Sequence, residues 1–187
     1  MNEKLENKVC LITGATNGIG EEAAKELNKM GAEIIFVARN QEKGNKLKEE
    51  LLKDTGREAT MIIANLSSQD EVKRAAEEFL ALGKPLDILL NNAGIMNRER
   101  NETIDGLEEV FSVNHLAYYT FTLMLAEKLK QTAGARVVNV ASGAHQFVKD
   151  MNFDDLQSEQ TYKPMQVYGQ SKLANILFTK TLAKKLS

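Results

Sequence analysis

Tyr168 and Lys172 lie four residues apart in the run Tyr-Gly-Gln-Ser-Lys, a spacing that places both side chains on one face of a helix. A tyrosine with an ordinary pKa of about 10 is too weak a general base at neutral pH. A nearby ammonium stabilises the phenolate, and lowering the pKa by roughly 2–3 units requires about 3–4 kcal/mol. Such a tyrosine could exchange a proton with an alcohol or carbonyl while a hydride moves. Tyr-x-x-x-Lys is also common by chance, so a surface or packing role is its default interpretation when it occurs alone.

A glycine-rich segment near the amino terminus could bind the phosphates of a hydride-carrying cofactor. The apolar run 9–12 precedes Gly14, Gly18 and Gly20, and a helical pattern follows over residues 21–30. This order predicts a strand, a tight turn and a helix whose first N–H groups favour an anion. A side chain on these glycines would block the approach of a pyrophosphate, or of the helix to the strand. The spacing G-x-x-x-G-x-G is not the commoner G-x-G-x-x-G, and a βα turn without a ligand is the alternative.

Strands and helices alternate along the whole chain, and each expected strand is a continuous apolar run. Strands are expected at 9–12, 33–38, 59–64, 86–90 and 136–140, and helices at 21–30, 41–54, from Ser67 or Ser68 to about 82, about 107–131 and about 166–186. This pattern predicts an α/β fold of the Rossmann type, with a doubly wound parallel sheet and helices on both faces. Ligands of such sheets bind at the carboxyl ends of the strands. The polar and glycine clusters occur at those ends: 13–20, Arg39, Asn65, 91–94 and Ser142.

Arg39 follows the second expected strand, where a dinucleotide-binding fold commonly has an acidic residue for the ribose 2′-hydroxyl. An arginine can bind a 2′-phosphate instead, whereas a carboxylate would repel it. The sequence therefore favours NADP(H) over NAD(H). A solvated loop charge is the alternative interpretation of Arg39.

Composition restricts the class of protein. The 187 residues fit a single domain, 1–187, and 43% hydrophobic content is ordinary for a globular protein. A net charge of −2 argues against nucleic-acid binding. No apolar run is long enough to span a membrane, and the polar N-terminal segment 1–8 shows no signal peptide, so we expect a cytoplasmic protein. Cys10 is expected to fill the core, and no metal-ligand spacing is evident.

Taken together, these motifs resemble the short-chain dehydrogenase/reductase family over essentially the whole chain from Lys8. The run 168–178, the segment Ala144-His145 and the long spacing between Ser142 and Tyr168 are similar to the retinol-dehydrogenase-like branch. The resemblance implies an NADP(H)-dependent oxidoreductase that interconverts an alcohol and a carbonyl. It implies a catalytic tetrad composed of Asn114, Ser142, Tyr168 and Lys172.

The resemblance assigns a role to each member of this tetrad. Ser142 would hydrogen-bond the substrate oxygen, and Tyr168 would be the general acid/base. Lys172 would hold the nicotinamide ribose hydroxyls and tune Tyr168. Asn114 would hold a water that links Lys172 to solvent; the alternative interpretation, a buried asparagine bonded only to backbone, is compatible with this role. His115 and His145 fall outside the tetrad and are expected to be a structural helix residue and a loop residue near the site mouth.

Cofactor contacts are expected from the glycine turn and from the strand ends. They are Gly14, Thr16, Asn17, Gly18, Ile19, Gly20, Arg39, Asn65, Leu66, Asn92, Ala93 and Gly94, together with Tyr168 and Lys172. Two positions depart from the family pattern. Asn65 stands where an aspartate is usual, and Ala141 replaces a serine that often precedes the catalytic one. An amide can still bond adenine, so we expect at most a modest loss from the first change.

Family members are usually longer, with two more strands and a substrate-covering segment after the tyrosine helix. We therefore expect the last strands and the C-terminal substrate-binding part to be absent, which leaves the fifth strand as an apolar edge. The chain would be a fragment, a shortened product, or a protein that needs a partner. A catalytically weak or inactive nucleotide-binding or partner-binding module is the alternative function, and an epimerase or dehydratase ranks last. The sequence does not identify the substrate.

A homodimer is a further expectation from the resemblance. It would form through the long helix and the final helix, with apolar residues such as Tyr118, Leu123, Leu125, Leu173, Ile176 and Leu177.

Overall fold

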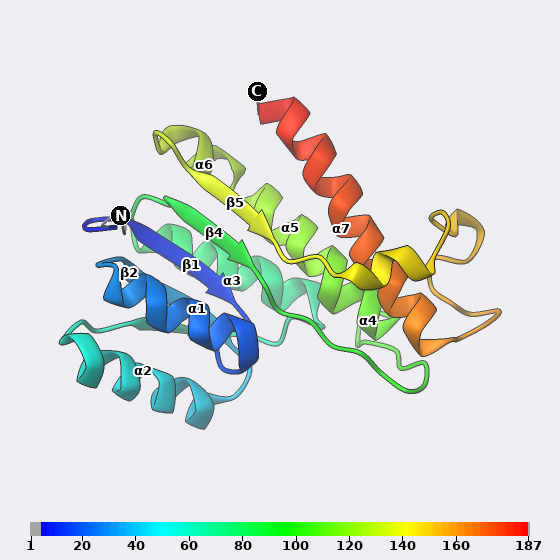
Figure 1. Ribbon diagram of the computed structural model, residues 1–187, viewed down its shortest axis with the longest axis horizontal. Coiled ribbons are helices and arrows are strands. Elements are labelled where there is room, and N and C mark those ends of the chain that lie inside the picture. The colour runs from blue at the N-terminus through cyan, green and yellow to red at the C-terminus, as the bar shows by residue number, and fades with distance from the viewer. Residues whose placement is uncertain (1–4, 187) are drawn as a thin grey trace.

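A five-stranded parallel sheet forms the centre of the computed structural model, which describes residues 5–186 (Figure 1). Residues 1–4, part of the polar segment in which no signal peptide is expected, and residue 187 lie outside that range. The strand order is β3-β2-β1-β4-β5. The strands are β1 Val9–Thr13, β2 Glu33–Ala38, β3 Thr60–Ile63, β4 Ile88–Asn91 and β5 Arg136–Asn139. The Rossmann-type fold predicted from the sequence is thereby confirmed.

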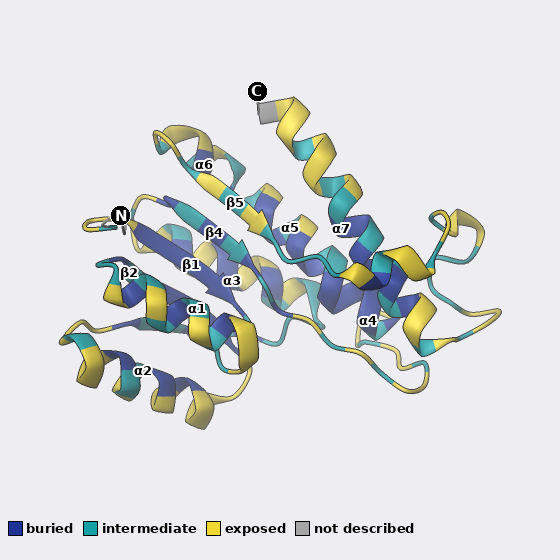
Figure 2. Cartoon of the chain, in the orientation of Figure 1, coloured by how far each residue is buried: buried dark blue, intermediate teal, exposed yellow. Residues whose placement is uncertain are grey.

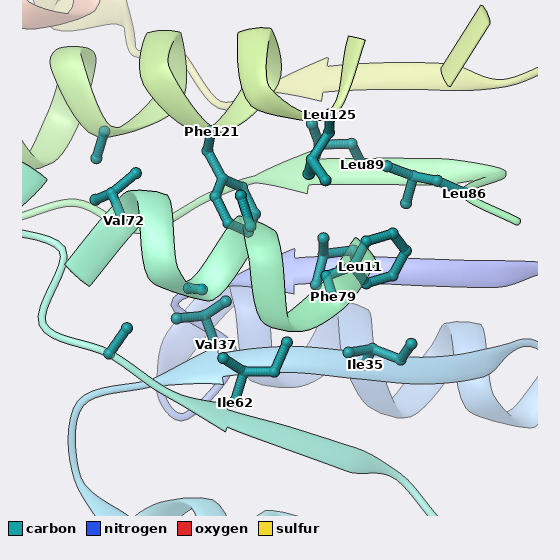
Figure 3. Close-up of a cluster of buried hydrophobic side chains, with 14 of the residues drawn as sticks. Leu11, Ile35, Val37, Ile62, Val72, Phe79, Leu86, Leu89, Phe121 and Leu125 are labelled. Atoms are coloured by element: carbon teal, nitrogen blue, oxygen red, sulfur yellow. The ribbon is translucent and has the colours of Figure 1, made fainter. Parts of the chain in front are cut away.

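Two hydrophobic cores, one on each face of the sheet, hold the helices in place. Cys10, Ile12 and Phe36 face α1 (Gly18–Lys29) and α2 (Gln41–Thr55). Leu11 and its neighbours on β2 and β4 face α3 (Gln69–Ala81) and α5 (Ala117–Met124), whose Phe79 and Phe121 pack over them (Figure 3). Cys10 is fully buried, and burial raises the pKa of its thiol to about 12, which fits the expected role as core filler.

The helix expected at about 107–131 is observed over residues 109–131, but it is not one regular α-helix. The helical region begins at α4 (Glu109–Phe111), because the carboxylate of Glu108 accepts hydrogen bonds from the N–H groups of the first turn. A π-helical turn, η1 (Ser112–Leu116), follows, and then α5 and α6 (Ala126–Gln131). A π-helical turn inside an α-helix occurs frequently at functional sites.

The segment after β5 returns along the sheet as α7. Two short 3-10 turns, η2 (Gly143–Phe147) and η3 (Phe153–Asp155), occupy the loop before α7 (Pro164–Leu186), which lies beside η1 and β5 (Figure 1). Within residues 5–186, β5 pairs only with β4, and Val138 is 46% exposed, so the expected apolar edge is present (Figure 2). None of the helices in that range is long and apolar enough to cross a membrane.

Candidate functional site

A cavity of about 710 Å³ opens at the carboxyl ends of the strands, and the loops that follow all five strands contribute to its wall. Most of the expected cofactor residues line it: Gly14, Thr16, Asn17, Ile19, Arg39, Asn65, Leu66, Asn92, Ala93, Gly94, Tyr168 and Lys172. Gly18, Gly20, Asn114 and Ser142 are not part of the wall. The topology therefore brings together residues that are far apart in the sequence.

The glycine turn is held against the loop after β4. Gly14 has a φ of +68°, and a Cβ atom there would lie 2.7 Å from the Cα of Ala93. A Cβ on Gly20 would collide with the side chain of Asn92 and the carbonyl of Gly14. Gly18 has a φ of +56°, and a Cβ there would meet nothing within 4 Å. Gly20 is therefore required by packing, Gly18 by backbone conformation, and Gly14 by both.

Hydrogen bonds fasten the same two loops together. Asn92 donates from Nδ2 to the carbonyls of Thr13 and Gly14 at 3.1 and 3.0 Å. The hydroxyl of Thr13 accepts from the backbone N–H groups of Asn92 and Ala93 at 3.0 and 3.2 Å. Thr13 is not among the residues expected to contact the cofactor, and its place at the end of β1 beside the glycines is the signal that could have found it. Asn92 thus shapes the turn as well as lining the cavity.

The N-terminus of α1 faces the cavity without a side-chain cap. Asn40 and Ser68 accept hydrogen bonds from the first turns of α2 and α3, but the side chain of Asn17 makes no such bond to α1. Ile19, in the first turn of α1, is 73% exposed and lines the cavity. Uncapped N–H groups at the positive end of a helix favour an anion, and an apolar side chain beside them can be covered by a ligand.

Lys172 is a buried cation in the wall of the same cavity. It is 2% exposed, and its ammonium donates to the carbonyl of Val140 at 3.1 Å. Among residues 5–186 no carboxylate lies within ion-pair distance of it. Burial lowers the pKa of Lys172 to about 8. An ammonium has three donors, so this one has further donors to offer to a ligand in the cavity.

Two tyrosine rings flank this ammonium. Nζ lies 5.5 Å from the ring centre of Tyr168 and 5.7 Å from that of Tyr118, within the range of cation–π attraction. Tyr118 is buried, donates to the carbonyl of Ala93 at 2.7 Å, and has a pKa raised by burial. The expectation that Tyr118 and Leu125 lie on a dimer surface is therefore wrong, since both are buried in the core.

Asn114 is fully buried in the π-helical turn and joins three elements. Its Oδ1 accepts from the N–H of Ile95 at 2.8 Å, and its Nδ2 donates to the carbonyl of Ile95 and to Oγ of Ser171 at 2.9 and 3.0 Å. The alternative of an asparagine bonded only to backbone is thus wrong, because Ser171 is a side-chain partner. A Cβ on Gly94 would lie 3.4 Å from both Oδ1 of Asn114 and Nζ of Lys172, so these three groups adjoin.

Ser142 follows Val140 and Ala141 beyond the end of β5 and is half-buried. Its hydroxyl accepts from the N–H of Ala144 at 3.1 Å, so it caps η2, and its carbonyl lies 2.6 Å from Nδ1 of His145. The structure therefore places Ser142 in the loop next to the cavity wall rather than in it. His145 lies in η2, the short 3-10 turn within the loop between β5 and α7.

The charge of the cavity wall is entirely positive. Arg39, Lys43 and Lys172 line it, and no aspartate or glutamate is among its described residues. Lys43 is absent from the expected cofactor residues, although its position one turn into α2, four residues after Arg39, returns it to the end of β2. The described residues also contain no group of three or more histidine, cysteine, aspartate or glutamate side chains that could hold a metal ion. The site is suited to a ligand with several negative charges.

Residues 8–187 match the family model described as short chain dehydrogenase. Among curated proteins, retinol dehydrogenase 12 of Mus musculus is 44% identical over 186 residues, which cover 99% of this chain and 58% of that protein. Polyprenol dehydrogenase of Homo sapiens is 37% identical, with 97% and 56% covered. The chain thus spans somewhat more than half the length of these relatives.

Solved structures show the same architecture. An uncharacterized protein from Mycobacterium paratuberculosis superposes with a TM-score of 0.85 at 34% identity, over 98% of this chain and 64% of that one. The Pseudomonas aeruginosa RhlG/NADP active-site complex superposes with a TM-score of 0.79 at 28% identity, over 99% of this chain and 69% of that one.

Proposed function

The chain belongs to the short-chain dehydrogenase family, and on that premise we propose that it is an NADP(H)-dependent oxidoreductase that interconverts an alcohol and a carbonyl by hydride transfer. One observation carries the proposal. A single cavity joins an uncapped helix N-terminus, three cations without a carboxylate, and the Tyr168–Lys172 pair.

The residues present fit a phosphorylated dinucleotide. The first N–H groups of α1 would hold its pyrophosphate, and Arg39 and Lys43 would bind a 2′-phosphate. Asn65 would bond adenine, and the free donors of Lys172 would hold the nicotinamide ribose hydroxyls. When bound, the nicotinamide supplies or accepts the hydride. A cavity whose wall carries positive charge alone favours NADP(H) over NAD(H), and the RhlG/NADP complex adds support from a relative.

Tyr168 would move the proton that accompanies the hydride. Its hydroxyl would donate to the substrate oxygen during carbonyl reduction and accept from it during alcohol oxidation. The ammonium of Lys172 lies 5.5 Å from the ring centre of Tyr168, the group that would move this proton, and both residues line the cavity wall. Ser142 would hydrogen-bond the substrate oxygen, and Asn114 would hold the water that connects Lys172 with solvent.

Turnover with NADPH tests this function. The protein is incubated with NADPH and a panel of aldehydes and ketones that includes retinaldehyde and a polyprenal, because relatives are named retinol and polyprenol dehydrogenases. Consumption of NADPH above that of a Tyr168→Phe control is expected. Equal rates in the two proteins would contradict the proposal.

A nucleotide-binding or partner-binding module without turnover is the second candidate, because β5, which pairs only with β4 among residues 5–186, offers an edge to which a partner could add. It predicts thermal stabilisation by NADPH, or solubility that depends on a partner, with no NADPH consumption. The same two proteins distinguish the candidates, since Tyr168→Phe removes turnover and leaves the phosphate-binding residues in place.

We also propose that the protein forms a homodimer through α5 and α7. Tyr119 and Leu123 on α5 are 45% and 46% exposed, and Leu177 on α7 is 44% exposed. The rings of Tyr119 and Phe178 lie 5.5 Å apart, which places the two helices side by side at this surface. Burial of these side chains in a partner would stabilise the dimer.

A further inference from the structure

A buried polar cluster connects the π-helical turn η1 with α7. Asn175 is fully buried, and its Nδ2 donates to the backbone carbonyl of Asn114 at 2.8 Å. Its Oδ1 lies 3.0 Å from Nδ1 of His115. These bonds are distinct from those of the Asn114 side chain, which reaches Ile95 and Ser171.

The chemistry of the groups fixes the direction of each bond. A backbone carbonyl only accepts, so the amide nitrogen of Asn175 must face Asn114 and its oxygen must face His115. The Nδ1 atom of His115 therefore carries a proton and donates it. Burial lowers the pKa of His115, so the ring is neutral at neutral pH with Nε2 unprotonated.

The buried polar cluster lies next to residues of α7 that line the cavity. Asn175 lies one helical turn after Lys172 on α7, and Ser171 directly precedes Lys172. The π-helical turn is thus bonded to α7 at two levels, through the Asn114 side chain to Ser171 and through the Asn114 carbonyl to Asn175. A slip of α7 along η1 would break both contacts and displace Tyr168 and Lys172 relative to the wall.

We propose that Asn175, held by the Nδ1–H group of His115, is a positioning residue that keeps α7 in register with the π-helical turn so that Tyr168 and Lys172 face the cavity. The inference rests on the proposed function for its consequence in turnover. The claim that Asn175 and His115 hold α7 in register with η1 does not depend on that function, because the contacts are made by the protein itself. Small displacements of catalytic groups reduce rates strongly even when the substituted residue does not touch the substrate.

Three single variants separate hydrogen bonding from packing. Asn175→Leu removes both hydrogen bonds at similar volume. His115→Phe keeps a ring beside Phe111 and Phe178, whose ring centres lie 5.2 and 6.2 Å away, but removes the donor. His115→Asn keeps a donor near the place of Nδ1 and removes the ring.

In steady-state kinetics with NADPH, Asn175→Leu and His115→Phe should lower kcat roughly 10- to 100-fold. The Kd for NADPH should change by no more than about twofold, because neither residue lines the cavity. His115→Asn should stay near wild type. The double variant Asn175→Leu/His115→Phe should be no slower than Asn175→Leu alone, because the two residues act as one unit. A wild-type kcat in Asn175→Leu would overturn the proposal. So would a near-wild-type kcat in His115→Phe, which keeps the ring, together with a low kcat in His115→Asn, which keeps the donor.

Hydrogen–deuterium exchange of the ligand-free protein gives a readout that is independent of turnover. Amides of segments 112–117 and 168–175 should exchange faster in Asn175→Leu and His115→Phe than in wild type and His115→Asn. Unchanged exchange in these variants would overturn the inference. If wild type does not consume NADPH, the proposed function fails, and the exchange data still decide whether Asn175 positions α7.

Discussion

The ammonium of Lys172 lies 5.5 Å from the ring centre of Tyr168, one turn earlier on the same helix, and the protein buries that ammonium without giving it a carboxylate partner among residues 5–186. A buried cation of this kind destabilises the free protein and is stabilised when a ligand supplies acceptors. The same lysine therefore links the pH dependence of turnover with that of stability.

Turnover should fall as the pH rises through the pKa of Lys172. Burial lowers that pKa to about 8, so the ammonium needed for ribose and phenolate contacts is lost above this value. Because kcat/KM reports the free enzyme, its basic limb should lie near pH 8 in wild type. In Lys172→Arg, which keeps its charge at all these pH values, the limb should move upward or vanish. A limb that stays near pH 8 in a folded Lys172→Arg protein would contradict this assignment.

The free energy of unfolding should also depend on the protonation of Lys172, but it should rise with pH where turnover falls. The folded pKa is below the ordinary value of 10.5, so the unfolded chain binds more protons between about pH 8 and 10.5. The free energy of unfolding therefore rises with pH in this window, and below it the burial penalty is fully present. Removing the charge in Lys172→Met should stabilise the ligand-free protein at pH 7 by up to roughly 3 kcal/mol.

Urea unfolding at several pH values measures this effect, with the exposed Lys180→Met on the same helix as the control. The difference between Lys172→Met and wild type should shrink between pH 8 and 10.5, whereas the control should show no such trend. A Lys172→Met protein less stable than wild type at pH 7 would show that the aliphatic packing of Lys172 outweighs the desolvation of its charge.

Arg39 and Lys43 should confer the preference for the 2′-phosphate. Losing a charge-assisted bond costs about 1.5–3 kcal/mol, so Arg39→Ala should weaken NADPH binding roughly 10- to 100-fold. Lys43→Ala should weaken it less, because Lys43 is an exposed, compact charge rather than a bidentate fork. NADH affinity should change little in both variants. Fluorescence titration measures each Kd.

Lys46→Ala is the matched control for this pair, since Lys46 lies on α2 one turn after Lys43, is exposed, and does not line the cavity. Its NADPH affinity should equal that of wild type. A parallel loss of NADPH and NADH affinity in Arg39→Ala would indicate that Arg39 does not read the 2′-phosphate.

Sequence patterns predict the fold of this chain well because its strands are continuous apolar runs. Leu11 and its neighbours in β1 could be assigned without tertiary information, and the parallel order then places Gly14, Arg39, Asn65 and Asn92 at one edge. The charged residue Lys43 escapes such an argument, because only the path of α2 turns its side chain back toward that edge.

The break in the expected helix 107–131 could not be found from periodicity. Glu108 caps α4 and Asn114 sits in a π-helical turn because of partners that are distant in sequence, such as Ile95 and Ser171. Local propensity does not report such bonds. The burial of Tyr118 beneath the loop after β4 is hidden for the same reason, since its partner is the carbonyl of Ala93.

Alanine substitutions of Gly20 and Gly18 should affect different properties: thermal stability for Gly20 and NADPH binding for Gly18. Gly20→Ala should lower the melting temperature strongly, because its Cβ would collide with Asn92 and with backbone. Gly18→Ala places its methyl in open space, so it should cost only about 1–2 kcal/mol for the positive φ. Its main effect should be weaker NADPH binding, since α1 begins there.

Gly143→Ala is the control for these glycine variants, because Gly143 has no atom within 4 Å of a new Cβ and no positive φ. Calorimetry should show a melting temperature near wild type for this variant. If Gly18→Ala loses as much stability as Gly20→Ala, the turn is more tightly packed around Gly18 than the structure shows.

The surface formed by α5 and α7 should determine the oligomeric state. Leu177 is 44% exposed on α7 and directly precedes Phe178, whose ring lies beside that of the exposed Tyr119 on α5, so a charge at position 177 should prevent association. Light scattering should show a dimer for wild type and a monomer for Leu177→Glu. Leu52→Glu is a close control, because Leu52 is 45% exposed on α2, which covers the opposite face of the sheet. A monomeric wild type would remove the dimer proposal, whereas equal loss of the dimer in both variants would trace it to general destabilisation rather than to this surface.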